Sequence, residues 1–413
     1  MRRAGAGMLV GMLSARVPAR WRPNRMSRTL ARLRARPGAV IDLTESNPTR
    51  VGLDYPPGIL DALADESGLV YDPQPRGLAG AREAVARHLD RQGVRVDPSR
   101  VALAAGTSEA YSRLFTLVCD PGDEVLVPRP GYPLLDHLTR LDGLTPRPYS
   151  LVYHGDWEID GDALERQVTP RTRALVVVNP NNPTGSFLSP ADRALVRDVC
   201  RRHGLALIAD EVFLRYGGHA GAAGGPTPAP APPAGRSVVG RMDGVLTFGH
   251  GGLSKAVGLP QLKLAWIVVD GPRRGVARAL RALDFVSDAY LSVASPVQLA
   301  AGRLLEDGDA VARSIAARVR RNRAALGRRV AAQPVHTLLR AGGGWYAVVQ
   351  VPATRSEESL VLELLQHDRV VVHPGYLYDF PHEAFVVLSL LPEPRRFESG
   401  VARVLARASG AAA

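Results

Sequence analysis

The stretch RALVVVNPNNPTGSFLSPADRALVRDVCRRHGLALIAD, residues 173–210, contains a strand, a helix and a second strand in sequence order. RALVVVNP (173–180) is a continuous apolar run that fits a strand buried in a parallel sheet. PADRALVRDVCRRHG (190–204) has amphipathic helical spacing and ends at a glycine, and LALIAD (205–210) is the next strand. This order predicts part of a parallel sheet covered by helices.

The same alternation continues on both sides of this unit. TSEAYSRLFTLV (107–118) has helical spacing, and a long helical pattern begins at about Ala282 and runs past Asn322. Four more segments are predicted strands of the sheet: VALAAG (101–106), DEVLVP (123–128), GVLTFG (244–249) and LAWIVVD (264–270). QPVHTLL, GGWYAVVQVP, RVVVHPG and AFVVLSLLP are expected to be strands of a smaller C-terminal domain.

Lysine is nearly absent from this chain. Of the 52 cationic residues only Lys255 and Lys263 are lysines, which leaves 50 arginines. A surface charge can be supplied by either residue, but a primary amine that condenses with an aldehyde cannot be an arginine, because guanidinium stays protonated. The two remaining lysines therefore mark a place where an amine is required.

The net charge of +12 raises the question of nucleic acid binding. The arginines are spread along the whole chain, and no basic run is interleaved with aromatic residues. We therefore interpret the charge as a solvated surface and expect no nucleic acid partner.

The ends and the linkers have a different character. Residues 1–17 are basic and then weakly apolar, and a later start at Met8 or Met12 is favoured over a signal peptide. Residues 1–20 are expected to be a disordered extension, and residues 217–235, which are rich in Gly, Pro and Ala, a flexible surface loop. No segment approaches the roughly 20 apolar residues that span a membrane.

Cysteine usage points to a reducing compartment. Cys119 and Cys200 match no metal or redox spacing, and we interpret them as inert core thiols. A cytoplasmic protein without a metal site is expected.

Polar residues follow several predicted strands, where open α/β sheets place their ligands. Asp210 ends LALIAD and Asn182 follows RALVVV. Tyr132 follows DEVLVP and Lys255 follows GVLTFG. Gly106, Thr107 and Ser108 form the turn between a strand and a helix, where N–H groups can bind phosphate. Pyridoxal 5′-phosphate (PLP) requires groups of these kinds. It needs an amine for its aldehyde, a carboxylate for the pyridine nitrogen, a donor for the ring oxygen, an aromatic side chain over the ring and a phosphate site.

The motifs NPNNPTG, ADEV and LSKAVGLPQLKLAW occur in an order and spacing that resemble the class I/II aminotransferases, which are fold-type I PLP enzymes. The resemblance covers roughly residues 20–410. It implies a three-layer α/β fold with a mainly parallel central sheet and a smaller α/β domain built from the two chain ends. The implied division is 21–55 plus 285–413 for the small domain and 56–284 for the large PLP-binding domain.

The resemblance also implies a role for each residue. Lys255 would form the internal aldimine and shuttle the proton between the substrate Cα and the cofactor C4′, and Asp210 would pair with the pyridinium nitrogen. Asn182 would hydrogen-bond the ring oxygen and Tyr132 would stack on the ring. Gly106, Thr107, Ser108, Ser254 and Lys263 would bind the phosphate. Tyr71, in YDPQPRG, would reach the phosphate of the neighbouring subunit, which implies a homodimer.

Most of these residues also have a purely structural interpretation. Asp210 could be an ordinary strand-end carboxylate and Asn182 a turn residue. Thr107 and Ser108 could simply cap their helix. Tyr132 could belong to the core, and Lys263 and Tyr71 to the surface.

The chain departs from the family pattern at several positions. Phe213 stands where a tyrosine often supports the ring oxygen, and whether Tyr216 substitutes is open. Gly252 and Ser46 occupy positions where serine and glycine, respectively, are usual. Val387 aligns where an arginine commonly grips the substrate α-carboxylate, and Arg340, Arg395 and Arg396 are nearby in sequence.

Three functions are compatible with this sequence. The first is an aminotransferase that moves an amino group between an amino acid and a 2-oxo acid. The second is another PLP reaction, such as decarboxylation, elimination or oxidation. The third is an aminotransferase-like regulator. This is disfavoured because only about 40 residues precede LTESNP, too few for a DNA-binding domain.

Overall fold

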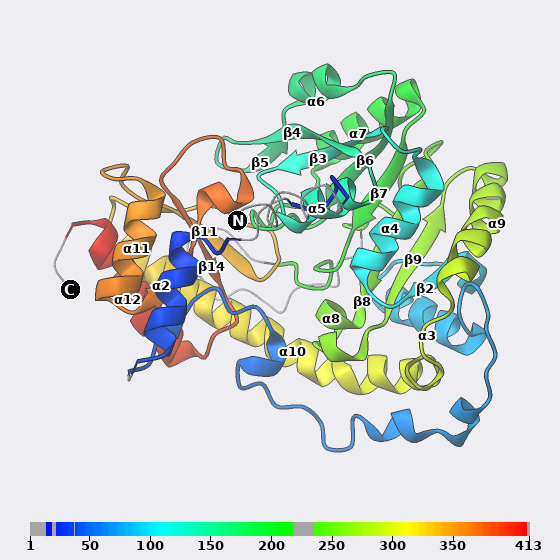
Figure 1. The fold of residues 1–413 in the computed structure, drawn as a ribbon, viewed down its shortest axis with the longest axis horizontal. Coiled ribbons are helices and arrows are strands. Elements are labelled where there is room, and N and C mark those ends of the chain that lie inside the picture. The colour runs from blue at the N-terminus through cyan, green and yellow to red at the C-terminus, as the bar shows by residue number, and fades with distance from the viewer. Residues whose placement is uncertain (1–13, 19–21, 37, 219–234, 411–413) are drawn as a thin grey trace, which may run out of the picture.

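An eight-stranded sheet forms the centre of the larger part of the molecule (Figure 1). The computed structural model describes residues 14–18, 22–36, 38–218 and 235–410. The strand order is β2-β9-β8-β7-β6-β3-β4-β5. The strands are β2 Val101–Ala104, β3 Glu124–Arg129, β4 Thr145–Tyr153, β5 Trp157–Ile159, β6 Thr172–Val178, β7 Ala206–Asp210, β8 Thr247–Gly252 and β9 Ala265–Asp270.

The sheet is mainly parallel, as predicted. The pairs β3–β4, β3–β6, β6–β7 and β7–β8 are parallel. β9 is antiparallel to both of its neighbours, β2 and β8, and the edge strand β5 is antiparallel to β4. β9 runs antiparallel to β8 because their connection is short and turns back through residues 253–264 without a long crossover helix.

Helices cover both faces of this sheet and create three layers. The helices of this part are α3 Ala79–Asp90, α4 Thr107–Val118, α5 Leu134–Leu141, α6 Gly161–Gln167, α7 Pro190–His203, α8 Leu253–Ala256 and α9 Arg273–Tyr290. In β6, Leu175 and Val177 pack with Val196 of α7 on one face, while Val176 packs with Leu114 of α4 on the other. This two-sided burial explains the uninterrupted apolar run that the sequence shows here.

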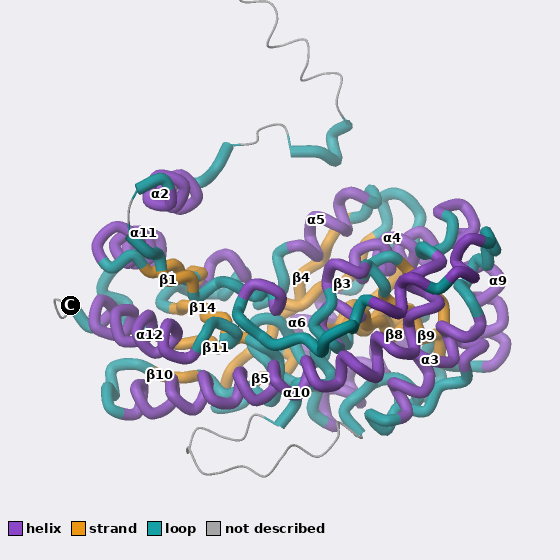
Figure 2. Tube along the Cα trace, turned by 90° about the horizontal axis from the view of Figure 1, so that it is seen from below, coloured by secondary structure: helices purple, strands orange, loops and turns teal. Residues whose placement is uncertain are grey.

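The smaller part of the chain contains a four-stranded sheet with the order β10-β11-β14-β13 and a parallel pair, β1–β12. The strands are β1 Ile41–Asp42, β10 Thr337–Leu338, β11 Tyr346–Gln350, β12 Val370–Val371, β13 His373–Pro374 and β14 Phe385–Ser389, with helices α2 Arg25–Arg34, α11 Glu357–His367 and α12 Pro394–Ala408. Figure 2 shows α2 lying on the outer side of α11. The β1–β12 pair joins the two ends of the chain.

Helix α10, Ser295–Ala331, runs along one side of the molecule from the smaller part to the large sheet (Figure 1). It packs on α3 at one end and on α12 at the other. Short 3-10 helices complete the chain: η1 Pro48–Arg50, η2 Asp61–Ala64, η3 Glu66–Leu69, η4 Pro98–Arg100, η5 Pro260–Leu262 and η6 Gly375–Tyr378.

Two predicted boundaries are wrong. The helical pattern that was expected to start at about Ala282 belongs to two helices, because α9 ends at Tyr290 and α10 begins at Ser295. Leu291 adopts a φ of 65°, which a helix cannot accommodate, and no glycine or proline marks the break at this residue. β8 starts at Thr247, three residues later than predicted, because residues 242–245 form a turn in which Val245 N–H donates to the Met242 carbonyl. The predicted loop 217–235 and extension 1–20 lie largely outside the described residues.

Candidate active site

The ends of β6, β7 and β8 open onto a cavity of about 160 Å³. Seven of the residues predicted from the sequence line it: Thr107, Ser108, Tyr132, Asn182, Asp210, Ser254 and Lys255. They come from five separate segments of the chain. The fold therefore brings together groups that the sequence separates by up to 148 positions.

Lys255 extends into this cavity from the short helix α8. Its Nζ lies 4.8 Å from the ring centre of Trp345 and 5.6 Å from that of Phe213. Burial lowers the pKa of Lys255 to about 8, and the negative charge of Asp210 opposes this change only in part. About a tenth of the side chain is consequently the neutral, nucleophilic amine at pH 7, far more than for a lysine with the ordinary pKa.

Asp210 is the last residue of β7 and is buried. Its Oδ2 accepts a hydrogen bond of 3.1 Å from the Tyr111 hydroxyl, and its Oδ1 accepts one of 3.1 Å from the backbone N–H of Val212. Both oxygens are thus held in a fixed orientation at the edge of the cavity.

His250 lies opposite Asp210 in the β7–β8 pair and packs edge-on against the Tyr111 ring at 4.4 Å. Burial lowers the pKa of His250, so the ring is neutral at physiological pH. Neither ring nitrogen has a hydrogen-bond partner within the described residues. Asp210 therefore borders a tyrosine and a neutral imidazole.

Asn182 belongs to the loop that follows β6, and it is buried with no described partner for its Oδ1. Other asparagines hold this loop in shape. Asn179 Oδ1 accepts a 3.1 Å hydrogen bond from the Leu188 N–H, and Asn181 Oδ1 accepts one of 3.0 Å from the Thr184 hydroxyl. The loop is therefore rigid around an amide that is left open toward the cavity.

The N-terminus of α4 forms the predicted phosphate end of the site. Gly106 caps this helix, and Thr107 and Ser108 begin it. Lys263 is not among the residues that line the cavity, but its Nζ would lie 3.2 Å from a Cβ added at Gly106. The second lysine of the chain therefore lies against the same helix terminus as the residues that were predicted to share its role.

Tyr132 lines the cavity with 43% of its surface exposed, so it is not a core residue. Its segment is attached to η6 of the smaller part of the chain. The Gly131 N–H donates to the Tyr378 carbonyl at 2.9 Å, and Arg129 forms ion pairs with Asp136 and Asp379. Tyr71 lies apart from this cavity on the surface.

Two residues that the sequence interpretation missed also line the cavity, Tyr111 and Tyr346. Tyr111 falls on the apolar side of a predicted helix, and Tyr346 in an apolar strand. The only feature of the sequence that could have indicated these two tyrosines is a hydroxyl group at a position that is otherwise apolar. Among the described residues, no group of three or more His, Cys, Asp or Glu side chains is arranged to hold a metal ion.

Comparison with known proteins agrees with this geometry. The profile of the family described as aminotransferase class I and II matches residues 40–389. The chain belongs to this family. The resemblance identified from the NPNNPTG, ADEV and LSK motifs is thereby confirmed, and the chain is a transaminase.

Individual relatives match this aminotransferase over nearly its whole length. The glutamate-pyruvate aminotransferase of Escherichia coli K12 is 26% identical, with 92% of this chain and 93% of that protein aligned. The alanine aminotransferase of Mycobacterium tuberculosis H37Rv is 28% identical, with 91% and 86% aligned. A mutant aspartate aminotransferase of Thermus thermophilus shares the fold, with a TM-score of 0.79, 23% identity and coverage of 96% and 99%. The predicted three-layer fold is confirmed.

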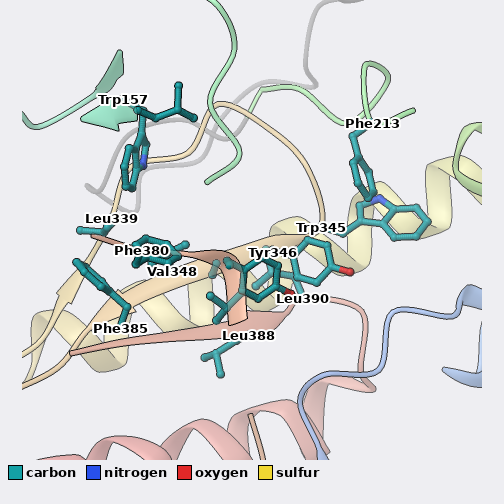
Figure 3. Packing of buried hydrophobic residues seen from close by; sticks show 14 of the residues in the cluster. Trp157, Phe213, Leu339, Trp345, Tyr346, Val348, Phe380, Phe385, Leu388 and Leu390 are labelled. Atoms are coloured by element: carbon teal, nitrogen blue, oxygen red, sulfur yellow. The ribbon is translucent and has the colours of Figure 1, made fainter. Parts of the chain in front are cut away.

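The structure answers the question about the ring-oxygen hydroxyl. In this aminotransferase the Phe213 ring makes edge-on contacts with the rings of Trp345 and Tyr346, with ring centres 5.3 and 6.3 Å apart; Figure 3 shows Phe213 beside Trp345. The Tyr216 hydroxyl donates to the Lys255 backbone carbonyl at 2.7 Å, and Tyr216 does not line the cavity. Tyr216 therefore fixes the lysine backbone and does not replace the missing hydroxyl.

The other departures lie in different surroundings. Gly252 lines the cavity, and a Cβ there would lie 3.1 Å from the Leu264 carbonyl oxygen. Val387 is fully buried in β14. Arg340 pairs with Asp156 at 3.1 Å, and Arg395 and Arg396 are exposed at the start of α12. No arginine lines the cavity within the described chain.

Proposed function

We propose that the cavity binds PLP and that the enzyme transfers an amino group from an amino acid to a 2-oxo acid. The observation that carries this proposal is the convergence of Lys255, Asp210 and Asn182 on one cavity. These side chains supply the amine, carboxylate and amide that suit the aldehyde, ring nitrogen and ring oxygen of PLP. Membership of the aminotransferase family supports the same cofactor.

Two features of the site fit this cofactor. The buried Asn182 amide has an unpartnered end, and an amide can turn its N–H group toward a ring oxygen by a simple flip. At Gly106, the absence of a Cβ keeps open the space beside Lys263 Nζ and the α4 N-terminus. A helix N-terminus and an ammonium group together favour a phosphate dianion.

PLP, when bound, supplies an electron sink for the negative charge that develops at the substrate Cα. Asp210 would hold a proton on the ring nitrogen by charge pairing, while the Tyr111 hydroxyl and the Val212 N–H keep the carboxylate oriented. Preorganised charge of this kind is worth several kcal/mol in a water-poor site.

Lys255 would have two tasks. Its neutral amine, available because burial lowers its pKa to about 8, would bind the cofactor covalently. Once substrate is bound, the same amine would accept the proton from the substrate Cα and deliver it to the cofactor C4′ within the same half-reaction, and it would run this transfer in reverse with the 2-oxo acid. Trp345 and Phe213 would shield this amine from water.

The remaining predicted residues would hold the cofactor in position. Tyr132 would cover one face of the ring. Thr107, Ser108, Ser254 and Lys263 would bind the phosphate through hydroxyl, backbone N–H and ammonium groups. We also propose that residues 56–284 form a large domain and that residues 21–55 and 285–413 form a small domain.

We further propose a homodimer. Leu69, Val70 and Tyr71 are consecutive and between 68% and 88% exposed, and Leu299 packs beside Gly68 next to them. An apolar patch of this kind on the surface is typical of an interface between protein chains. A partner covering this patch would be well placed to receive Tyr71 near its own phosphate site.

The cytoplasm is the proposed location. Cys119 and Cys200 form no disulfide, and burial raises the pKa of both thiols to about 12, which makes them unreactive. Among the described residues, no helix is long and apolar enough to cross a membrane.

The proposed reaction can be tested in a single half-reaction. PLP-loaded enzyme would be mixed with L-alanine or L-glutamate, and the visible cofactor spectrum and the products would be followed. Aminotransfer predicts one equivalent of 2-oxo acid per active site. Release of carbon dioxide, or release of ammonia or peroxide with the amino group not retained on the cofactor, would instead favour decarboxylation, elimination or oxidation.

A further inference from the structure

Two departures from the family pattern, Ser46 and Val387, lie on segments that are hydrogen-bonded to each other beside the cavity. Val387 lies opposite Val348 of β11 and His373 of β13, and it is fully buried. Ser46 lines the cavity directly. At position 387 the family pattern has an arginine, and this chain has a valine. At position 46 the pattern has a glycine, and this chain has a serine with a hydroxyl group.

Tyr346 connects these two positions. In the β11–β14 ladder, Val348 pairs with Val387 and Tyr346 with Ser389. Directly paired residues project to the same face of a sheet, and side chains alternate between faces along a strand, so Tyr346 lies on the face of Val387, two residue pairs farther along. Tyr346 reaches the cavity, whereas Val387 does not. A phenol therefore stands near the place where an arginine would have extended.

Ser46 and Tyr346 line the cavity together, and interaction with the Ser46 side chain acts to lower the pKa of the Tyr346 hydroxyl. The segment that carries Ser46 is fixed to β14 at two points. Ser389 N–H donates to the Leu43 carbonyl at 2.7 Å, and the Ser389 hydroxyl donates to the Glu45 carbonyl at 2.7 Å. This anchoring makes the hydroxyl pair a built feature of the cavity wall.

The pair is uncharged. Burial raises the pKa of Tyr346 to about 12, although the interaction with Ser46 opposes the change. The charged residues that line the cavity in the described chain are Asp210 and Lys255, whose roles are already assigned. Arg129, the arginine on the segment that carries Tyr132, is engaged by Asp136 and Asp379.

We propose that Ser46 and Tyr346 form a neutral subsite that hydrogen-bonds the polar group attached to the amino-bearing carbon of the donor. The inference rests on the proposed function, because it takes the donor amine to react at Lys255. It assigns as substrates amino donors in which that group is a carboxylate or an uncharged carboxamide. A guanidinium would select strongly for the carboxylate, whereas two neutral hydroxyls accept either group with comparable hydrogen bonds.

The test is a set of single-turnover half-reactions on PLP-loaded enzyme with L-alanine, L-alaninamide and ethylamine, followed by the cofactor spectrum. We expect L-alaninamide to react within about tenfold of L-alanine, since one neutral hydrogen bond is worth roughly a factor of ten. Ethylamine, which has no polar group at this position, is expected to react about a hundredfold more slowly.

Two variants probe the pair, and a third serves as control. Tyr346→Phe and Ser46→Gly should each lower the rate constant per unit concentration about tenfold for L-alanine and L-alaninamide, and leave ethylamine unchanged. Tyr376→Phe is the matched control, because Tyr376 is an exposed tyrosine of η6 that does not line the cavity. It should change none of the three rates. PLP affinity and the thermal midpoint of each variant check that the site is intact.

Two results would overturn the inference while sparing the proposed function. One is a preference of more than a thousandfold for L-alanine over L-alaninamide. The other is an equal loss for ethylamine and L-alanine in Tyr346→Phe. If none of the donors changed the spectrum of PLP-loaded wild-type enzyme, the proposed function itself would fail, and the neutral subsite would fail with it.

Discussion

The Tyr111 hydroxyl donates a 3.1 Å hydrogen bond to Oδ2 of Asp210, and both side chains are buried. A hydrogen bond to a buried carboxylate is worth about 1.5–3 kcal/mol. Tyr111→Phe removes only the hydroxyl and keeps the ring that packs on His250. We expect the rate of amino transfer to fall by roughly tenfold to a hundredfold, with the fold retained.

Two measurements separate an effect of Tyr111→Phe on the reaction rate from an effect on the fold. The half-reaction rate with L-alanine and the circular dichroism spectrum would be measured for wild type and Tyr111→Phe. A variant with the wild-type rate would show that the hydroxyl does not orient Asp210. Asp210→Asn should be more severe, because it removes the negative charge itself.

The lowered pKa of Lys255 makes PLP incorporation dependent on pH. An ordinary lysine amine has a pKa of 10.5, and burial lowers that of Lys255 to about 8. Only the neutral amine reacts with an aldehyde, so the incorporation rate of the PLP-free protein should rise with pH up to about 8 and then level off. Stopped-flow absorbance at a series of pH values measures this. A rate that keeps rising up to pH 10 would contradict the buried environment described for Lys255.

Glu357 organises the η6 segment of the smaller part. Its carboxylate accepts hydrogen bonds of 2.8 Å from the Tyr376 N–H and 2.7 Å from the Phe385 N–H. Glu357→Gln would turn an amide N–H2 toward one of these donors, and we expect a loss of about 1–3 kcal/mol in the free energy of unfolding. Denaturant titration measures it. Glu358→Gln is the matched control, since Glu358 makes only a surface ion pair of 3.6 Å with Arg25 and should change stability little.

The proposed dimer depends on the apolar patch at Leu69, Val70 and Tyr71. Val70→Asp would bury a charge in the interface and should shift the protein toward monomer in sedimentation or light scattering. Val335→Asp provides the comparison, because Val335 is 59% exposed and belongs to another part of the surface. Equal behaviour of the two variants would show that the patch is not the interface.

Much of the fold could be predicted because local patterns carried the information. The helix predicted over 107–118 matches α4, since its helical spacing begins directly after a strand and a glycine. β8 was harder to predict. Its last four residues are Gly249, His250, Gly251 and Gly252, and three of them are glycines, which have little strand preference. A Cβ at Gly251 would lie 2.9 Å from the Trp266 ring, so contact with a neighbouring strand determines this segment.

Some residues of the site could likewise be predicted from the sequence, and others could not. Lys255 could be identified because lysine is almost absent elsewhere, and Asp210 and Asn182 because they follow recognisable strands. Tyr111 and Tyr346 could not be found, since their importance depends on partners 99 and 300 positions away in the chain. Only the folded chain brings such pairs together.

The most direct test of the account is to identify the residue that binds the cofactor. PLP-loaded enzyme would be reduced with borohydride, digested and analysed by mass spectrometry. Lys263→Arg serves as the control, because it leaves Lys255 as the only lysine and keeps a cation at position 263. The account predicts one PLP group per chain, on the peptide that contains Lys255, in both proteins. Attachment to Lys263, or no labelled peptide in a PLP-loaded wild-type enzyme, would contradict it.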